Sequence, residues 1–280
     1  MKIELRALVA RHPAARSGAA PALANLHIAI ASGERVAVIG PSGAGKTTLL
    51  QVLACALPPS QGELLLNGTA PWALPAAALR QLRGTLFLAP QVPPLPPRQR
   101  VVTSVLAGRL PAMGLFRSLR SLFYPADIPA AYDALDRFDL AEKLFERVDR
   151  LSGGERQRVG LARTLLAPAR LWLIDEPLSA LDPTRARQAL ETLLDAAHDR
   201  QATVVATLHQ VDMALAHFPR IIGLRDGALV FDLPAQAVSR EVLASLYDQY
   251  EHELRGEVPA NAALNHPDRP EPVPAVMHCR

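Results

Sequence analysis

The feature that most constrains this chain is a glycine-rich run, GPSGAGKT, at Gly40–Thr47. It follows a short apolar segment, Arg35–Ile39 (RVAVI), and precedes a helical pattern at Lys46–Leu57. The spacing G-x-x-x-x-G-K-[ST] between a strand and a helix is that of a phosphate-binding loop, in which backbone N–H groups and the helix dipole favour phosphate. We predict that Lys46 reaches the β- and γ-phosphates of a nucleotide and that Thr47 ligates Mg²⁺. The predicted nucleotide cradle comprises Gly40, Pro41, Ser42, Gly43, Ala44, Gly45, Lys46, Thr47 and Thr48.

A second apolar segment, Leu171–Ile174 (LWLI), runs directly into two acidic residues, Asp175 and Glu176. Ligands of open α/β sheets bind at the carboxyl ends of the strands, which is where these carboxylates would lie. We predict that Asp175 holds Mg²⁺, chiefly through water, and that Glu176 polarises the water that attacks a phosphate.

The order of the apolar segments predicts the fold class. Buried strands are expected at RVAVI, at LWLI and at Thr203–Thr207 (TVVAT), and helical periodicity follows each of them. Such alternation is typical of an α/β fold with a mostly parallel sheet covered on both faces. Asn25–Ile30 and Glu63–Leu66 are expected to add antiparallel strands, and residues 100–165 show only helical patterns. The prediction is therefore a phosphate-loop NTPase core with an antiparallel β subdomain and a helical subdomain, the latter at about residues 92–165.

The 25 prolines of the chain fall into clusters that mark two irregular segments. One cluster contains Pro90, Pro93, Pro94, Pro96 and Pro97. Because proline continues neither a helix nor a central strand, residues 90–99 are expected to form a stiff, extended loop. The other cluster lies in residues 256–280, which have no usable periodicity and are expected to be disordered, so the folded domain is placed at residues 1–255.

Composition excludes several other classes of protein. A net charge of +3 without a basic cluster does not provide the footprint of a nucleic-acid-binding protein. Cys55 and Cys279 form neither a metal-binding spacing nor a disulfide framework, which favours a reducing compartment. Neither a signal peptide nor an apolar stretch of the roughly 20 residues needed to span a bilayer is recognisable. On its own, composition predicts a cytosolic globular protein.

The segment LSGGERQR at Leu151–Arg158 resembles the signature motif of the ATP-binding subunits of ABC transporters. Ser152, Gly153 and Gly154 would present a hydroxyl and free N–H groups at a helix N-terminus, which again suits phosphate. In this family the motif completes the γ-phosphate site of the opposite subunit. The resemblance therefore implies a head-to-tail homodimer that binds two molecules of ATP, each with Mg²⁺.

Other segments resemble further elements of this family, in the same order, and the resemblance covers about residues 2–250. It implies that Gln91, in FLAPQ, senses the γ-phosphate and contacts Mg²⁺, and that Asp182, in SALD, contacts nucleotide at the dimer interface. It also implies that His209, after TVVAT, contacts the γ-phosphate and completes a catalytic set with Glu176 and Gln91. His12 stands near the position where the family usually stacks an aromatic residue on adenine; adenine contact and an exposed loop histidine both remain open.

The implied activity is ATP hydrolysis coupled to transport. The chain would be peripheral on the cytoplasmic face of the bacterial inner membrane, bound to separate permease subunits and served indirectly by a periplasmic solute-binding protein; a nucleic-acid partner is not expected. In the family, the loop after Gln91 and the region of residues 100–150 receive the permease. The VPPLPP run fits such a docking surface, although the prolines could equally serve only to shape the loop.

Three segments narrow the transported solute. Thr207–Asp212 (TLHQVD), the region from Leu106 to Arg117 and the ending Val242–Tyr247 are similar to the phosphonate-import branch of the family. We therefore expect phosphonate or a related phosphorus oxyanion as cargo. The alternatives are a transporter of another small polar solute, such as phosphate or an amino acid, a soluble ABC ATPase outside transport, and a nucleotide-binding regulatory module without catalysis.

Overall fold

The computed structural model describes residues 1–12, 20–123, 125 and 127–248. The proline-rich segment at 256–280, predicted to be disordered, and the predicted domain boundary at residue 255 lie outside these residues. The phosphate loop, the signature motif and the strand-end carboxylates all fall within the described ranges.

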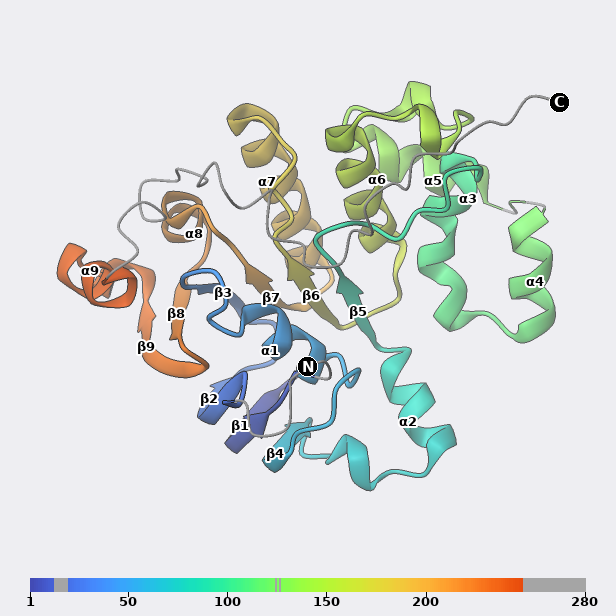
Figure 1. The fold of residues 1–280 in the computed structure, drawn as a ribbon. Helices are drawn as coiled ribbons and strands as arrows, with labels where there is room; N and C mark the ends of the chain where they lie inside the picture. Colours follow the sequence, from blue (N-terminus) through green and yellow to red (C-terminus); the bar gives the residue numbers. More distant parts are fainter. Residues whose placement is uncertain (13–19, 124, 126, 249–280) are drawn as a thin grey trace, which may run out of the picture.

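A six-stranded sheet with the order β5-β6-β7-β3-β8-β9 forms the centre of the molecule (Figure 1). The strands β5, β6, β7, β3 and β8 are parallel to one another, and only β9, at the edge, pairs antiparallel, with β8. The three strands expected from apolar runs are confirmed as β3, β6 and β7, each buried along nearly its whole length because helices or a second sheet cover both faces. The bounds are Leu86–Ala89 (β5), Leu171–Asp175 (β6), Thr203–Thr207 (β7), Arg35–Ile39 (β3), Arg220–Arg225 (β8) and Ala228–Pro234 (β9).

A separate three-stranded antiparallel sheet lies beside the first one, with the order β2-β1-β4. It confirms the antiparallel additions expected from the sequence, and it includes a first strand that the sequence reading did not identify. An apolar cluster that includes Leu50 and Leu53 fills the space between this sheet and the central one. The bounds are Leu23–Ile30 (β2), Ile3–Ala10 (β1) and Gln61–Leu66 (β4).

The first helix, α1 (Lys46–Leu53), packs between the two sheets and ends four residues before the predicted end at Leu57. Its backbone turns into the left-handed region at Cys55 (φ 55°), which a continuing helix cannot contain. The opposite face of the central sheet is covered by α7 (Pro183–Asp199) and α8 (Val211–His217) (Figure 1). Successive side chains of β6 point to opposite faces of the sheet. Trp172 and Ile174 pack in the apolar cluster with α7, whereas Leu171 and Leu173 pack in the cluster with α1.

The region expected to be helical forms helices and 3-10 turns, without a named strand among its described residues. The principal helix, α6 (Gly153–Leu166), packs against α3 (Val101–Leu106) and α5 (Ile128–Asp136), while α4 (Leu115–Phe123) lies at the outer edge (Figure 1). The remaining helices are α2 (Ala76–Arg83) and α9 (Arg240–Tyr247). Short 3-10 turns lie at Pro71–Ala73, Ala107–Ala112, Ala141–Lys143, Val148–Arg150 and Ala235–Ala237.

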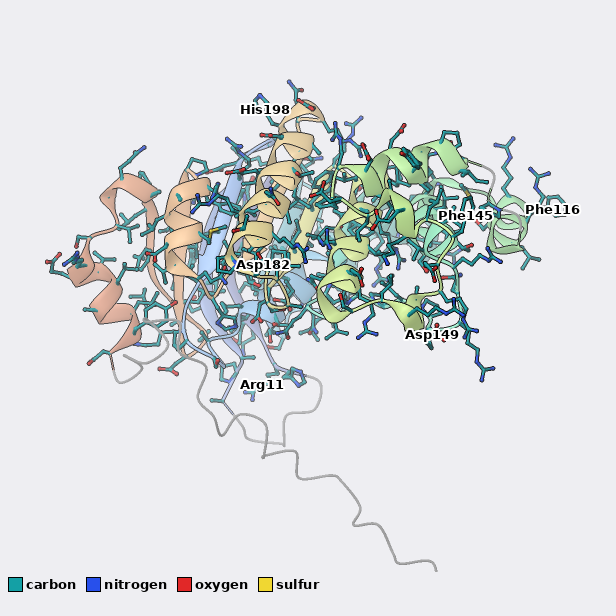
Figure 2. All side chains as sticks on the ribbon, turned by 90° about the horizontal axis from the view of Figure 1, so that it is seen from above. Arg11, Phe116, Phe145, Asp149, Asp182 and His198 are labelled. Atoms are coloured by element: carbon teal, nitrogen blue, oxygen red, sulfur yellow. The ribbon has the colours of Figure 1, made fainter. Side chains whose placement is uncertain are left out.

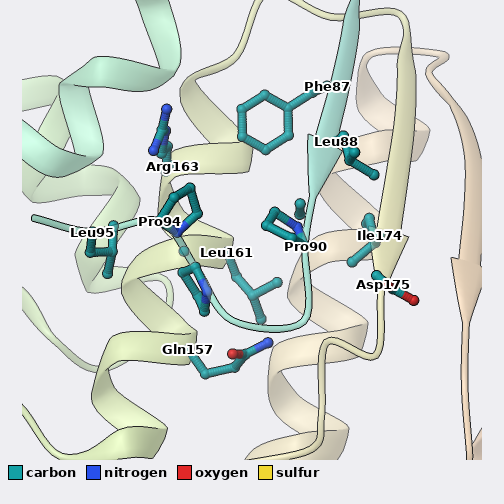
Figure 3. Close-up of a pocket in the computed structure, with 13 residues that line it drawn as sticks. Phe87, Leu88, Pro90, Pro94, Leu95, Gln157, Leu161, Arg163, Ile174 and Asp175 are labelled. Atoms are coloured by element: carbon teal, nitrogen blue, oxygen red, sulfur yellow. The ribbon is translucent and has the colours of Figure 1, made fainter. Parts of the chain in front are cut away.

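Residues 90–99 contain neither helix nor strand, as the prolines predicted. This loop leaves β5 and packs directly on α6, because a Cβ on Gly160 would lie 2.6 Å from Cγ of Pro93. A cavity of about 60 Å³ lies between the loop, α6 and the end of β6, and Pro90, Pro94 and Leu95 of the loop line it together with Gln157 and Leu161 of α6 (Figure 3). The proline loop therefore connects the central sheet to the helical region through side-chain packing.

Candidate nucleotide-binding site

The run Gly40–Lys46 connects the end of β3 to the start of α1, and its path requires glycine. Gly40 has a φ of 148°, and a Cβ there would lie 1.9 Å from the carbonyl oxygen of Leu224. Gly45, with a φ of 95°, would bring a Cβ to 2.4 Å from the carbonyl oxygen of Ala22. Only a residue without a side chain fits such positions, so the positive φ angles and these close carbonyl groups together require the two glycines.

Lys46 is 5% exposed and folds back over the loop. Its Nζ donates to the carbonyl oxygens of Gly40, at 2.6 Å, and Pro41, at 3.0 Å. These bonds satisfy part of the hydrogen-bonding capacity of the buried ammonium group. Burial of a charged group without such partners would strongly destabilise the fold. A phosphate bound in the loop would offer the Lys46 ammonium group an anionic partner. Both partners of that hydrogen bond would then carry charge, which makes it stronger than a bond to a neutral carbonyl oxygen.

A hollow of about 330 Å³ opens in front of the loop. It brings together residues that the sequence reading selected from separate segments, namely the loop and the start of α1 with His12, Glu176 and His209. The lining consists of His12, Ala22, Ser42, Gly43, Ala44, Gly45, Lys46, Thr47, Thr48, Glu176 and His209. The volume lies within the range of small-molecule binding pockets.

The three residues predicted to act in catalysis meet at one carboxylate. Oε1 of Glu176 lies 2.5 Å from Nε2 of His209, and Oε2 of Glu176 accepts a hydrogen bond of 2.6 Å from Nε2 of Gln91. Gln91 follows β5, Glu176 follows β6 and His209 follows β7, and these three strands are parallel neighbours in the sheet. Because these strands are parallel and adjacent, their carboxyl ends lie at one edge of the sheet. Gln91 and Glu176, which are 85 positions apart in the sequence, come into contact there.

Asp175 ends β6 as a buried residue, and its carboxylate is held from the neighbouring strand. The hydroxyl of Thr207, at the end of β7, donates to Oδ1 of Asp175 at 2.6 Å. The same hydroxyl accepts from the backbone N–H of Glu176 at 3.0 Å. Thr207 was not among the predicted site residues, although a threonine at the carboxyl end of the strand TVVAT, on the side where ligands bind, was a visible signal.

The signature residues Ser152, Gly153 and Gly154 do not line the hollow. They form the N-terminus of α6, where Ser152 Oγ accepts from the N–H of Glu155 at 3.2 Å and Glu155 Oε2 accepts from the N–H of Ser152 at 2.7 Å. This reciprocal arrangement is a capping box. The bond from the Ser152 N–H also holds the pKa of the Glu155 carboxyl below its ordinary value.

Asp182 also lies outside the hollow, at the N-terminus of α7 (Figure 2), where it accepts from the N–H of Arg185 at 3.1 Å. That bond lowers the pKa of the Asp182 carboxyl. The two helix starts are adjacent, since a Cβ on Gly154 would lie 2.9 Å from the carbonyl oxygen of Ala180. Within one chain, therefore, the signature motif and the SALD segment form a second group of predicted site residues, apart from the phosphate loop.

A phosphate loop at a strand–helix junction, with two carboxylates at the end of another parallel strand of the same sheet, defines a phosphate-loop ATPase. The model of the ABC transporter family matches residues 23–179. The chain belongs to the ABC transporter family, as the LSGGERQR segment predicted, and its fold is that of an ABC ATPase.

Similar proteins extend over the whole chain. A protein named Phosphonates import ATP-binding protein PhnC, from Polaromonas sp. strain JS666, is 65% identical over 280 residues, which is 100% of both chains. PhnC 2 of Albidiferax ferrireducens is 63% identical over 281 residues, again covering 100% of both. PhnC 1 of Pseudomonas aeruginosa PAO1 is 52% identical over 257 residues, or 92% of each chain.

Solved structures support the same architecture. The dimeric structure of MJ0796, a bacterial ABC transporter cassette, is 26% identical and matches with a TM-score of 0.71 over 84% of this chain and 100% of the other. A dimeric post-hydrolysis state of MJ0796 bound to ADP and Pi matches with the same TM-score at 25% identity and the same coverage.

Proposed function

We propose that this protein is the ATP-hydrolysing subunit of a bacterial importer that takes up phosphonate or a related phosphorus oxyanion. The observation that supports hydrolysis is the Glu176 carboxylate, held between His209 and Gln91 beside a phosphate loop. Similarity to phosphonate-import proteins over the full length of the chain supports the cargo. Hydrolysis would supply the energy, while a separate membrane subunit would conduct the solute.

The residues of the site divide the work of hydrolysis. Lys46 and the N–H groups of the phosphate loop would stabilise the negative charge of the β- and γ-phosphates. Glu176 would orient the attacking water and accept its proton, with His209 and Gln91 close to the γ-phosphate. Each carboxylate oxygen has two lone pairs, so Glu176 can keep its bonds to His209 and Gln91 and still accept a bond from water.

The donors near the loop fit Mg²⁺. This ion is usually held in proteins by one or two side chains together with substrate phosphates, rather than by a complete protein cage. Thr47 at the start of α1, Asp175 at the end of β6 and the amide oxygen of Gln91 provide hard oxygen donors; Nε2 of Gln91 is already bonded to Glu176. Bound there with ATP, Mg²⁺ would neutralise charge that develops on the phosphates.

The separation of the two groups of site residues supports a head-to-tail homodimer. Ser152, Gly153, Gly154 and Asp182 lie outside the hollow of their own chain, so a second chain is needed to bring a signature motif to a bound nucleotide. The MJ0796 cassette, which is similar in fold, is dimeric. His12 lines the hollow and remains our candidate for adenine contact.

Exposed apolar residues on the helical side support a permease partner. Val92 of the proline loop is 79% exposed. Phe116 of α4 is 81% exposed and lies at the outer edge of the molecule (Figure 2). None of the described helices is long and apolar enough to cross a bilayer. We place the subunit on the cytoplasmic face of the inner membrane, with its permease served by a periplasmic solute-binding protein.

Growth and binding measurements test this proposal together. A bacterial strain that depends on this importer should grow on methylphosphonate as sole phosphorus source with the wild-type subunit, and should fail with Glu176→Gln. The purified Glu176→Gln subunit should bind ATP as the wild type does and lose at least about 100-fold in turnover, because a general base contributes that much or more.

Growth on inorganic phosphate is the control and should be equal in both strains. Equal growth on methylphosphonate would contradict the cargo. Near wild-type turnover of Glu176→Gln would contradict the assignment of Glu176 as the general base.

A further inference from the structure

Thr207 occupies a position that connects both carboxylates of the site. It is the last residue of β7, and its register partners are Asp175 on β6 and Val38 on β3. The side chain has no solvent exposure, and Asp175 beside it is 5% exposed. A strand end so enclosed would ordinarily hold an aliphatic residue such as valine, which has the same shape.

The hydroxyl of Thr207 uses both of its hydrogen-bonding roles on neighbouring site residues. Its single proton is donated to Oδ1 of Asp175 at 2.6 Å, which fixes the orientation of that carboxylate and leaves Oδ2 without this bond. Its oxygen accepts the backbone N–H of Glu176 at 3.0 Å. One buried hydroxyl therefore contacts the side chain of the first acidic residue and the backbone of the second.

The backbone of Glu176 needs such support. Its φ is 44°, in the left-handed region, which is unfavourable for a residue that carries a side chain. This conformation directs the Glu176 side chain to the place where Gln91 and His209 contact it. The bond from the Glu176 N–H to Thr207 holds the peptide in a conformation that the chain alone disfavours.

We infer that Thr207 is a positioning residue that sets the geometry of Asp175 toward Mg²⁺ and of Glu176 toward the attacking water. This inference rests on the proposed roles of the two carboxylates. Without the hydroxyl, Oδ1 of Asp175 and the N–H of Glu176 lose a buried partner, and the peptide before Glu176 is free to relax. Displacement of a reacting group by about 1 Å is enough to reduce a rate 100-fold.

The same strand offers a matched control. Thr203, at the other end of β7, is equally buried, and its hydroxyl donates to the carbonyl oxygen of Met1 while accepting from the N–H of Gly33. Thr203→Val removes a buried hydroxyl of the same type at the edge of the sheet opposite the site. Thr207→Ser keeps the hydroxyl at the site and removes only one methyl group.

Steady-state ATPase kinetics, melting temperatures and Mg²⁺-dependent binding of a fluorescent, non-hydrolysable ATP analogue form the test. For Thr207→Val we expect a kcat about 10- to 100-fold lower, an almost unchanged KM for ATP, and a several-fold higher Mg²⁺ concentration for half-maximal analogue binding. Thr207→Ser should recover most of kcat. Thr203→Val should lower the melting temperature and leave kcat and the Mg²⁺ dependence unchanged.

A wild-type kcat and Mg²⁺ dependence in Thr207→Val would overturn the inference, as would an equal fall of kcat in Thr203→Val. Should Thr207→Val not fold, Thr207→Cys keeps a small side chain with a weak donor, and its kcat must then fall below that of Thr207→Ser. Glu176→Gln separates the two proposals: high turnover in that variant contradicts the role of Glu176, whereas the Mg²⁺ dependence of analogue binding still reports on Thr207 and Asp175.

Discussion

Two helices of this protein begin in glycine-rich turns that suit phosphate, and their N-termini are completed in opposite ways. The N-cap of α1 is Gly45, and no side chain caps the helix, so the first N–H groups of α1 face the hollow that Lys46 also lines. The N-terminus of α6 is instead closed by its own side chains, Ser152 and Glu155. Helix N-termini leave unsatisfied donors; at α1 no side chain accepts from them, whereas at α6 the hydroxyl of Ser152 accepts from the N–H of Glu155.

The two glycine-rich helix starts therefore have similar local chemistry but differ in how far each is shaped within one chain. The phosphate loop is enclosed by Ala22 and Leu224 and is already shaped for an anion. The signature turn is exposed at Ser152 and Gly153 and forms no pocket with the loop of its own chain. We therefore propose that the first region is a preformed receptor for phosphate, whereas the second meets a nucleotide only when another subunit presents it.

The largest effect is expected from a substitution in the phosphate loop. Lys46→Ala removes the cation that pairs with the phosphates, and we expect ATP affinity to fall at least about 100-fold, as loss of charge-assisted bonds in a buried site implies. Titration of a fluorescent ATP analogue measures this loss. Ser152→Ala, measured in the same way on the isolated subunit, should bind almost as the wild type does; undiminished affinity of Lys46→Ala would be inconsistent with the phosphate-loop assignment.

A smaller effect is expected when only the signature turn is changed. Ser152→Asp keeps a good helix N-cap but places a negative charge against the phosphates of the opposite subunit, so turnover should fall about tenfold or more while the melting temperature is kept. ATPase assays of the purified variants measure this loss.

Mixing the Ser152→Asp and Lys46→Ala subunits should restore part of the turnover. Half of the sites in a mixed dimer combine an intact loop with an intact signature turn. If mixing restores nothing, the head-to-tail arrangement is wrong.

The smallest effect concerns the capping box itself. Because the folded-state pKa of Glu155 is below its ordinary value of 4.5, the ionised carboxylate stabilises the fold at pH values above about 4.5, and this stability is lost as pH falls through the folded-state pKa. Glu155→Gln should lower the free energy of unfolding at pH 7 by on the order of 0.5 kcal/mol. Thermal melts from pH 7 to pH 3.5 should show the two proteins converging at the acid end; a constant difference would exclude the charge as its cause.

Local sequence patterns predicted some strands of the central sheet closely and missed others. β3 and β7 have the predicted bounds because continuous apolar runs bounded by turn residues are typical of strands buried on both faces. The strand β8 was missed: Gly223 interrupts its apolar run, and that glycine is explained only by the ring of Phe231 on β9, which would lie 2.4 Å from a Cβ there. The four-residue β5 is a strand because it pairs with β6, since its own sequence is too short to predict it.

The sequence by itself determined the phosphate loop, because glycine dihedrals, the lysine and the helix that follows are all set within a few neighbouring residues. It also named Glu176, through the acidic pair that follows an apolar strand, and it named Gln91 and His209 through resemblance to a family. Only the tertiary structure decided that these three meet at one carboxylate and that Thr207 supports it, because the parallel order β5-β6-β7 aligns strand ends that are distant along the chain. The same structure separated the signature turn from the loop, since the N-terminus of α6 lies on another part of the fold and does not line the hollow.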